Sequence, residues 1–128
     1  MSARILSIST GRVVPLALPN PHKGSQKTTR STIVKSPVSS LQDPQSIVCQ
    51  TVGLEGDQQA NHSVHGGRDK AVYCYPAEHY PFWKGALKTT EDKLARLDQH
   101  GAFGENLTIE GLTEEQVYIG DVWQIEEV

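Results

Sequence analysis

The stretch GLEGDQQANHSVHGGRDK, residues 53–70, gathers glycines, charged residues and imidazoles that cannot build a hydrophobic core. Glycine and short polar residues favour turns, because glycine adopts positive φ angles without a steric penalty. The flanking segments SIVCQTV (46–52) and KAVYCYP (70–76) are rich in β-branched and aromatic residues, which favour strands. We therefore expect residues 53–70 to form a long polar loop between two strands.

The N-terminal third predicts strands around a polar loop. The segments ARILSIS (3–9) and RVVPLAL (12–18) flank a Thr-Gly pair, which indicates a first hairpin. The polar segment PNPHKGSQKTTR (19–30) predicts an exposed loop. STIVKS (31–36) is a further strand candidate, whereas the two prolines of SPVSSLQDPQ (36–45) argue against a continuous element.

Two short helices are predicted in the second half. In AEHYPFWKGALK (77–88) apolar residues recur at steps of three and four, and Pro81 is tolerated only in the first turn. In TEDKLARLDQ (90–99) Thr90 is a possible N-cap. Two apolar leucines of this second segment, Leu94 and Leu97, are expected to face inward.

The C-terminal part predicts more strands. ENLTI (105–109) and VWQIE (122–126) read as strands, with a capping box at 113–116 and a Gly120-Asp121 turn between them. Many short strands separated by turns, with two inserted helices, predict a mostly β fold of the barrel or sandwich type. The length of 128 residues is that of one domain, 1–128.

Composition excludes several classes of protein. The formal net charge of -3 provides no basic field for nucleic acid, which is therefore an unexpected partner. The longest apolar run, residues 13–18, is interrupted by Pro15 and is too short to span a membrane. Only Cys49 and Cys74 are present and no leader segment precedes the first strand, so we expect a cytoplasmic protein without a disulfide framework.

The segment HGGRDK (65–70) has the chemistry of an anion-binding pocket. Paired glycines allow backbone N–H groups to converge, and Arg68 and Lys70 could add positive charge for a phosphate or a pterin anion. The pattern is neither GxxxxGK[ST] nor GxGxxG, so an ordinary nucleotide-binding loop is not supported. The alternative is that each glycine only permits a sharp turn.

Metal and thiol chemistry are less favoured from the residues alone. His62, His65 and Cys74 could contribute to a zinc site, but no HExxH, CxxC or fourth ligand accompanies them. Cys74 lies between tyrosines in a strand-like run, where a small core residue is more common than a nucleophile. A second polar loop, FGENL (103–107), has hydrogen-bonding groups at Glu105 and Asn106 that could orient a polar ring system, although it could equally be a turn before a strand.

Four blocks together resemble a known family. GLEGDQQAN, VHGGRDKAVYCYPAEHY, FGENL and GLTEEQVYIGDVW occur in the order and at the spacing of the MOSC domain, named for the C-terminal part of molybdenum cofactor sulfurase. Within that family the chain is most similar to the hydroxylaminopurine-resistance (YiiM-like) type. The resemblance covers about Val52 to Trp123 and implies a MOSC-type β-barrel with short inserted helices.

The resemblance also implies a molybdopterin form of the molybdenum cofactor and the reduction of N-hydroxylated substrates, such as hydroxylaminopurines and amidoxime-like compounds, with electrons from a possible redox partner. The implied cofactor-binding residues are His65, Gly66, Gly67, Arg68, Lys70, Phe103, Gly104, Glu105 and Asn106. His65 is additionally a candidate catalytic proton donor, because the pKa of histidine is normally close to neutrality; the alternative is that it only hydrogen-bonds the loop. Asp57 is expected to brace the loops.

The sequence departs from the family at one point. MOSC proteins carry a cysteine in a Pro-rich segment after the final matched strand, and its thiolate is taken to bind molybdenum; no cysteine follows Cys74 here. No metal-ligating residue is therefore assigned. We expect a domain that is incomplete at its C-terminal end, with an open β edge suited to self-association, or a relative that binds the cofactor or a small anion without catalysis.

Overall fold

The computed structural model describes residues 2–18 and 27–126. Its centre is a four-stranded sheet in the order β4-β1-β8-β7, formed by Lys35–Ser40, Arg4–Gly11, Leu107–Glu110 and Cys74–Pro76. Strand β1 is antiparallel to both β4 and β8, whereas β7 is parallel to β8. Two ribbons accompany the sheet: β2 (Val14–Leu18) with β3 (Lys27–Ser31), and β5 (Cys49–Gln50) with β6 (Gly53–Leu54).

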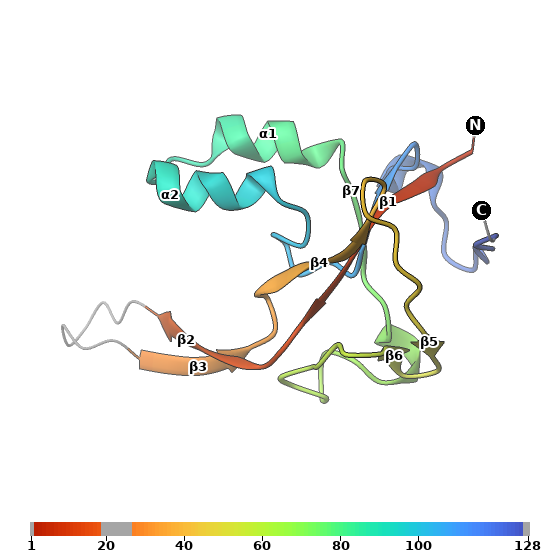
Figure 1. Cartoon of the computed structure of the whole chain (residues 1–128), viewed down its shortest axis with the longest axis horizontal. Coiled ribbons are helices and arrows are strands. Elements are labelled where there is room, and N and C mark those ends of the chain that lie inside the picture. The colour runs from red at the N-terminus through yellow and green to blue at the C-terminus, as the bar shows by residue number, and fades with distance from the viewer. Residues whose placement is uncertain (1, 19–26, 127–128) are drawn as a thin grey trace.

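The helices lie together on one side of the molecule (Figure 1). Helix α1 spans His79–Ala86, and α2 (Glu91–Leu94) continues directly into the 3-10 turn η2 (Ala95–Asp98). The predicted helix over 77–88 is confirmed, with Pro81 in its first turn. Thr90 precedes α2 with extended backbone, but its side chain caps no N–H. Among the described residues, no helix is both long and apolar enough to cross a membrane.

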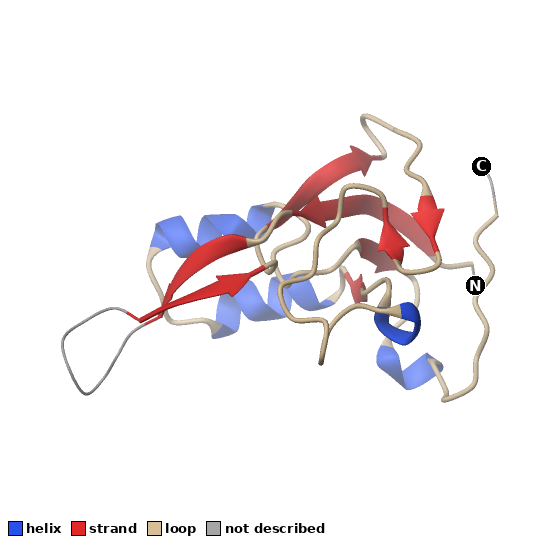
Figure 2. Cartoon of the chain, turned by 90° about the horizontal axis from the view of Figure 1, so that it is seen from below, coloured by secondary structure: helices blue, strands red, loops and turns tan. Residues whose placement is uncertain are grey.

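Two further 3-10 turns lie in loops: η1 spans Arg68–Lys70 and η3 spans Glu114–Gln116. The predicted capping box is confirmed: the side chain of Thr113 accepts from the backbone N–H of Gln116, and Oε1 of Gln116 accepts from the backbone N–H of Thr113 at 3.0 Å. The prediction of a mostly β chain with short helices is confirmed as well. The described strands form an open sheet and two separate ribbons (Figure 2), so the closed barrel is not confirmed.

The predicted N-terminal hairpin is wrong. Strand β1 pairs with β4 and β8, and β2 pairs with β3 instead of β1. Gly11 is needed for close approach rather than for a turn: a Cβ at this position would lie 2.6 Å from the carbonyl oxygen of Val34. A glycine between two apolar runs therefore marks a close approach of β1 to residues 34–35, which local sequence cannot distinguish from a hairpin turn.

Three other boundaries differ from the prediction. The segment 31–36 contains the end of β3 and the start of β4 rather than one strand, and β4 includes Pro37. Proline is tolerated there because β4, among the described strands, is an edge strand that pairs with β1 alone. Residues 27–30 form part of β3 although a loop was predicted, while residues 19–26 of that loop lie outside the described residues.

The remaining strand predictions are partly correct. Only Cys49–Gln50 is a strand within 46–52, and only Cys74–Pro76 within 70–76. The predicted strand over ENLTI (105–109) overlaps β8, which starts two residues later at Leu107 and ends at Glu110. Residues 122–126 form no strand, because no described segment pairs with them.

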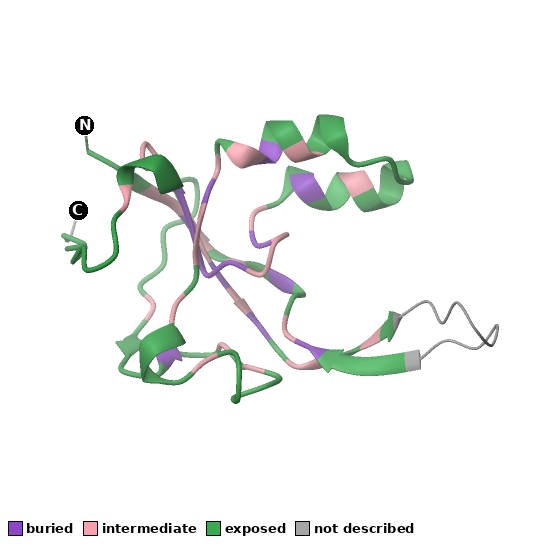
Figure 3. Cartoon of the chain, turned by 180° about the vertical axis from the view of Figure 1, so that it is seen from behind, coloured by how far each residue is buried: buried purple, intermediate pink, exposed green. Residues whose placement is uncertain are grey.

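The interior is small and unusually polar. The buried apolar residues are Leu54, Tyr80, Leu97, Leu107 and Ile109. The buried polar residues are Ser7, Ser9, Ser31, Lys35, Glu105, Asn106 and Thr108. Buried segments concentrate where the strands of the central sheet cross (Figure 3). Because buried polar groups require hydrogen-bond partners, the arrangement around these residues is specified by directional bonds as much as by packing.

Candidate functional site

A cavity of about 660 Å³ opens between segments from four parts of the chain: residues 30–35, 57–61, 64–73 and 103–106. This volume lies in the range of small-molecule sites. Six of the residues singled out from the sequence line it: His65, Gly66, Lys70, Phe103, Gly104 and Asn106. The two loops that were expected to meet, HGGRDK and FGENL, therefore do share one recess.

Three of the singled-out residues lie outside the lining. Gly67 and Arg68 are exposed, and Arg68 begins the 3-10 turn η1. Glu105 is fully buried beneath the loop rather than open to the cavity. Their assignment to a cofactor stays a prediction, and the geometry indicates that Glu105 contributes by holding the loop.

The HGG loop requires its glycines. The φ angles of Gly66 and Gly67 are 81° and 76°, a region that favours glycine. A Cβ on Gly66 would also lie 2.8 Å from Cγ of Gln59. Because φ has the same sign at both glycines, the pair does not itself form the alternating αR–αL anion nest.

His65 is positioned by its backbone. Its N–H donates to the carbonyl of Asn61 at 2.8 Å, and its exposed ring makes no hydrogen bond with any described residue. The ring therefore lines the cavity with both nitrogens open to a ligand or to water. A role for the ring in holding the loop is not seen among the described contacts.

The floor of the cavity is a buried polar cluster around Asp57. Its Oδ1 accepts from the N–H of Gly11 at 2.9 Å, and its Oδ2 accepts from Nζ of Lys35 at 3.2 Å and from Nδ2 of Asn106 at 2.9 Å. The side chains of Asp57 and Lys35 are only 1% and 8% exposed. Asp57 thus ties the GLEGD segment to β1, to β4 and to the residue before β8, which is the bracing role expected for it.

The side-chain amide of Asn106 forms its hydrogen bonds with other groups of the protein. Its Oδ1 accepts from the N–H of Tyr73 at 3.0 Å, and its Nδ2 donates to the carbonyl of Ser9 at 3.2 Å as well as to Asp57. Its backbone N–H donates to the carbonyl of Tyr73 at 2.8 Å. Both amide protons are therefore occupied, and Asn106 shapes the cavity rather than offering it a free donor.

Glu105 organises the loop that carries Phe103 and Gly104. Its carboxylate accepts from the hydroxyl of Tyr80, from the N–H groups of Gly101 and Phe103 at 2.9 and 3.0 Å, and from Oγ1 of Thr108 at 3.0 Å. Burial of the phenol, and then its hydrogen bond to Glu105, raise the pKa of Tyr80 far above its ordinary value. The hydroxyl therefore stays protonated and donates to the carboxylate.

Aromatic rings support the same loop. The ring centroid of Phe103 lies 4.7 Å from that of Tyr75 and 5.1 Å from that of Tyr80. Nε1 of Trp83 donates to the hydroxyl of Tyr75 at 2.8 Å, which fixes helix α1 to β7. Tyr73 lines the cavity with nearly half of its surface exposed. Together Tyr73 and Phe103 give the cavity an aromatic wall against which a planar ring could stack.

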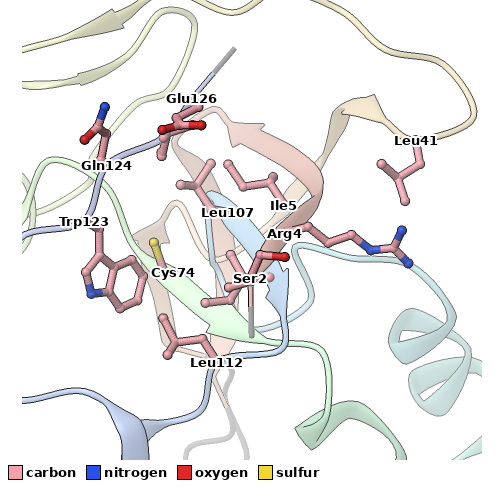
Figure 4. Close-up of a pocket in the computed structure, with 13 residues that line it drawn as sticks. Ser2, Arg4, Ile5, Leu41, Cys74, Leu107, Leu112, Trp123, Gln124 and Glu126 are labelled. Atoms are coloured by element: carbon pink, nitrogen blue, oxygen red, sulfur yellow. The ribbon is translucent and has the colours of Figure 1, made fainter. Parts of the chain in front are cut away.

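A second cavity, of about 720 Å³, is mostly apolar and lies against β1, β8 and the segment 123–126. Cys74 and Trp123 face it from neighbouring segments (Figure 4). Burial raises the pKa of the Cys74 thiol, which disfavours the reactive thiolate. Cys74 lines this second cavity and is not part of the lining of the first. Among the described residues, no three His, Cys, Asp or Glu side chains cluster in a way that could hold a metal ion.

Sequence reasoning missed two residues of the site. The sequence pattern places Lys35 in a predicted strand and Tyr73 in a strand-like run, and it indicates a place in the site for neither. Lys35 lies within a β-branched segment, where a single lysine usually faces solvent, so local sequence carries no sign of its burial. The position of Tyr73 shortly after the glycine-rich loop could have marked it as a candidate site residue. The exposure of its side chain could not have been predicted from the sequence.

The fold and the site define a small strand-rich domain in which the HGGRDK and FGENL loops line one polar, aromatic-walled recess. The family model of the MOSC domain matches residues 61–128, which include both loops. The chain belongs to the MOSC domain family.

Three curated relatives extend this result. The chain is 42% identical over 96% of its length to the uncharacterized protein YflK of Bacillus subtilis (strain 168), of which it covers 48%. It is 44% identical over 70% of its length to protein YiiM of Escherichia coli (strain K12), of which it covers 38%. It is 34% identical over 72% of its length to a protein named reductase from Gibberella moniliformis (strain M3125 / FGSC 7600), of which it covers 16%. The chain thus spans less than half of each relative. No solved structure matches it.

Proposed function

We propose that this MOSC domain binds the molybdenum cofactor in the cavity between the HGGRDK and FGENL loops and takes part in the reduction of N-hydroxylated substrates. The observation that carries the proposal is that both loops line one recess of ligand size, with His65 and Gly66 from one loop and Phe103 and Asn106 from the other. The similarity to a protein named reductase supports the reaction class.

The residues present suit the organic part of the cofactor. Three cationic side chains line the cavity against two carboxylates: Arg30, Lys35 and Lys70, with Asp57 and Asp69. A phosphate would be held by the cations, and a flat pterin by stacking on Tyr73 or Phe103. The thiol of Cys74 belongs to the other cavity, so no thiolate ligand is assigned to the metal from the described lining.

When bound, the cofactor would supply the electron pair that cleaves an N–O bond. The reaction R–NHOH + 2e⁻ + 2H⁺ → R–NH₂ + H₂O requires two protons, and a redox partner protein would renew the electrons. The imidazole of His65 is the proton donor in this scheme, because its ring lines the cavity and hydrogen-bonds to no described residue. We further propose that the protein acts in the cytoplasm, since both cysteines are free thiols.

The test is to purify the chain from a host that makes the cofactor and to measure molybdenum, released pterin and hydroxylaminopurine reduction. Stoichiometric molybdenum and pterin support the proposal. A protein without metal or pterin that reduces no hydroxylaminopurine overturns it. His65→Gln should retain the cofactor but lower the turnover rate about 100-fold or more. His62→Gln is the matched control, because His62 is exposed and outside the cavity lining.

A second function is favoured by the lack of a cysteine in the lining: a module that binds the cofactor or a small anion without catalysis. This function predicts bound pterin or phosphate in a protein that reduces no hydroxylaminopurine. The pterin and turnover measurements therefore distinguish the two.

A further inference from the structure

We infer that Lys35 is the oxyanion-binding residue of the cavity, with its ammonium group donating hydrogen bonds to a phosphate-type ligand. The inference deepens the proposed function and rests on the use of this cavity as a ligand site. It assigns the contact to a residue outside the HGGRDK loop, whose Arg68 lies beyond the lining.

The hydrogen-bonding of Lys35 is incomplete. Its side chain is 8% exposed, and Nζ makes one hydrogen bond with a described residue, to Oδ2 of Asp57 at 3.2 Å. An ammonium group has three N–H donors. A nearly buried ammonium with two unpaired donors is costly unless a ligand or water accepts from it. Because Lys35 lies in the cavity lining, an oxygen-rich ligand in the cavity would complete its bonding.

Asp57 only partly neutralises this charge. The same carboxylate accepts from the backbone N–H of Gly11 and from Nδ2 of Asn106. The carboxylate of Asp57 therefore shares its negative charge among three donors. The ammonium of Lys35 is only partly neutralised, and its remaining positive charge acts on the cavity. Asp57 at the same time fixes the ammonium in place, so little side-chain entropy is lost when an anion binds.

The surrounding charges favour an anion over a cation. Arg30 and Lys70 are exposed at the rim of the cavity, and Nζ of Lys70 donates to the carbonyl of Val64 at 3.1 Å. The carboxylate of Asp69 also lies in the lining, but no carboxylate other than Asp57 contacts Lys35. The lining thus carries three cationic side chains, Arg30, Lys35 and Lys70, against two carboxylates, Asp57 and Asp69.

The first experiment titrates inorganic phosphate into the purified chain at constant ionic strength, with chloride as the replaced anion, and follows binding by calorimetry and backbone amide NMR. The wild type should bind phosphate saturably, with shifts at Gly66 and Asn106. The double variant Lys35→Met with Asp57→Asn removes both charges without leaving a buried unpaired carboxylate. It should bind about tenfold more weakly or worse. Equal binding by this variant and the wild type would overturn the inference.

The control is Lys84→Met, which removes one lysine charge on α1, where Lys84 pairs with Asp98 outside the cavity. This variant should bind phosphate as the wild type does. A loss as large as that of the double variant would mean that net charge alone governs binding, and would overturn the assignment to Lys35.

The single variant Asp57→Asn tests whether Lys35 binds phosphate or serves only as a structural partner of Asp57. Without the competing carboxylate, Lys35 should bind phosphate more tightly, whereas a purely structural pair predicts weaker binding once it is broken. Weaker or unchanged binding in a folded variant contradicts the inference. If neither variant folds, the ¹⁵Nζ resonance of Lys35 in the wild type decides: it should shift when phosphate is added, and an unmoved resonance would overturn the inference.

These outcomes do not depend on molybdenum. Phosphate binding through Lys35 in a protein that never acquires the cofactor would leave this inference standing and overturn the proposed function. Cofactor retained at full occupancy in the double variant, with unchanged phosphate affinity, would overturn the inference and leave the proposed function standing.

Discussion

Asp57 and Asn106, 49 positions apart in the chain, are joined by a hydrogen bond of 2.9 Å from Nδ2 to Oδ2 at the floor of the cavity. Asp57 belongs to the GLEGD segment and Asn106 to the FGENL loop, and each also contacts β1, through Gly11 and Ser9 respectively. The bond therefore ties the GLEGD segment to the FGENL loop. At the floor of the recess, a carboxylate and an amide from different blocks of sequence therefore bond to each other, and each also bonds to β1.

Asn106→Ala should lower the free energy of unfolding by about 3 kcal/mol, because the buried carbonyl of Ser9, the part-buried N–H of Tyr73 and the carboxylate of Asp57 would each lose a partner. Urea denaturation measures the change. Asn61→Ala, in the same lining but with its Oδ1 accepting only from Ser63 N–H at the surface, should cost about 1 kcal/mol or less. Equal costs for the two variants would contradict the role given to Asn106.

Glu105→Gln should destabilise the protein by about 2 kcal/mol or more, because an amide nitrogen would face donors that now meet carboxylate oxygens. Amide hydrogen exchange at Phe103 and Gly104 should accelerate with it. Tyr80→Phe removes only one donor to the carboxylate and should have a smaller effect, about 1 kcal/mol. Unchanged exchange at the loop in Glu105→Gln would show that the carboxylate does not hold it.

The contact between helix α1 and turn η3 should depend on pH. Nε2 of His79 lies 2.7 Å from Oε2 of Glu114, and this hydrogen bond holds the pKa of Glu114 below its ordinary value of 4.5. A lowered folded-state pKa contributes stability above the unfolded value, and that contribution is lost as pH falls through the folded pKa. A carboxyl NMR titration should show the pKa of Glu114 returning toward 4.5 in His79→Ala. The same low pKa in that variant would assign the shift to another group.

We propose that the chain self-associates through exposed strand edges and apolar residues. Strands β4 and β7 are the edges of the described sheet, and the C-terminal segment exposes Ile119, Val122 and Ile125. Sedimentation velocity should show association that increases with concentration. Val122→Lys with Ile125→Lys should reduce it, whereas Lys93→Ala on α2 should not. A wild type that stays monomeric at all concentrations would contradict the proposal.

Several elements were predictable because their signals are local. Helix α1 follows from apolar spacing and a first-turn proline, and the capping box at η3 from residues three positions apart. The hairpin predicted around Gly11 was wrong because the pairing of β1 is not local. The strands that pair with β1 come from residues 35–40 and 107–110, which no local pattern identifies. Burial of Lys35 escaped prediction for the same reason, because its partner Asp57 is 22 positions away.

The sequence by itself determined that this is a strand-rich chain of the MOSC type, with glycines where the backbone requires positive φ. It also identified HGGRDK and FGENL as the two polar loops of the candidate site. These properties depend on neighbouring residues and on the order of motifs. Only the tertiary structure decided that the loops meet, that Glu105 and Asn106 serve the protein rather than a ligand, and that Lys35 lies at the cavity. The reason is physical: burial and hydrogen bonding depend on segments that become neighbours only when strands distant in the chain pair.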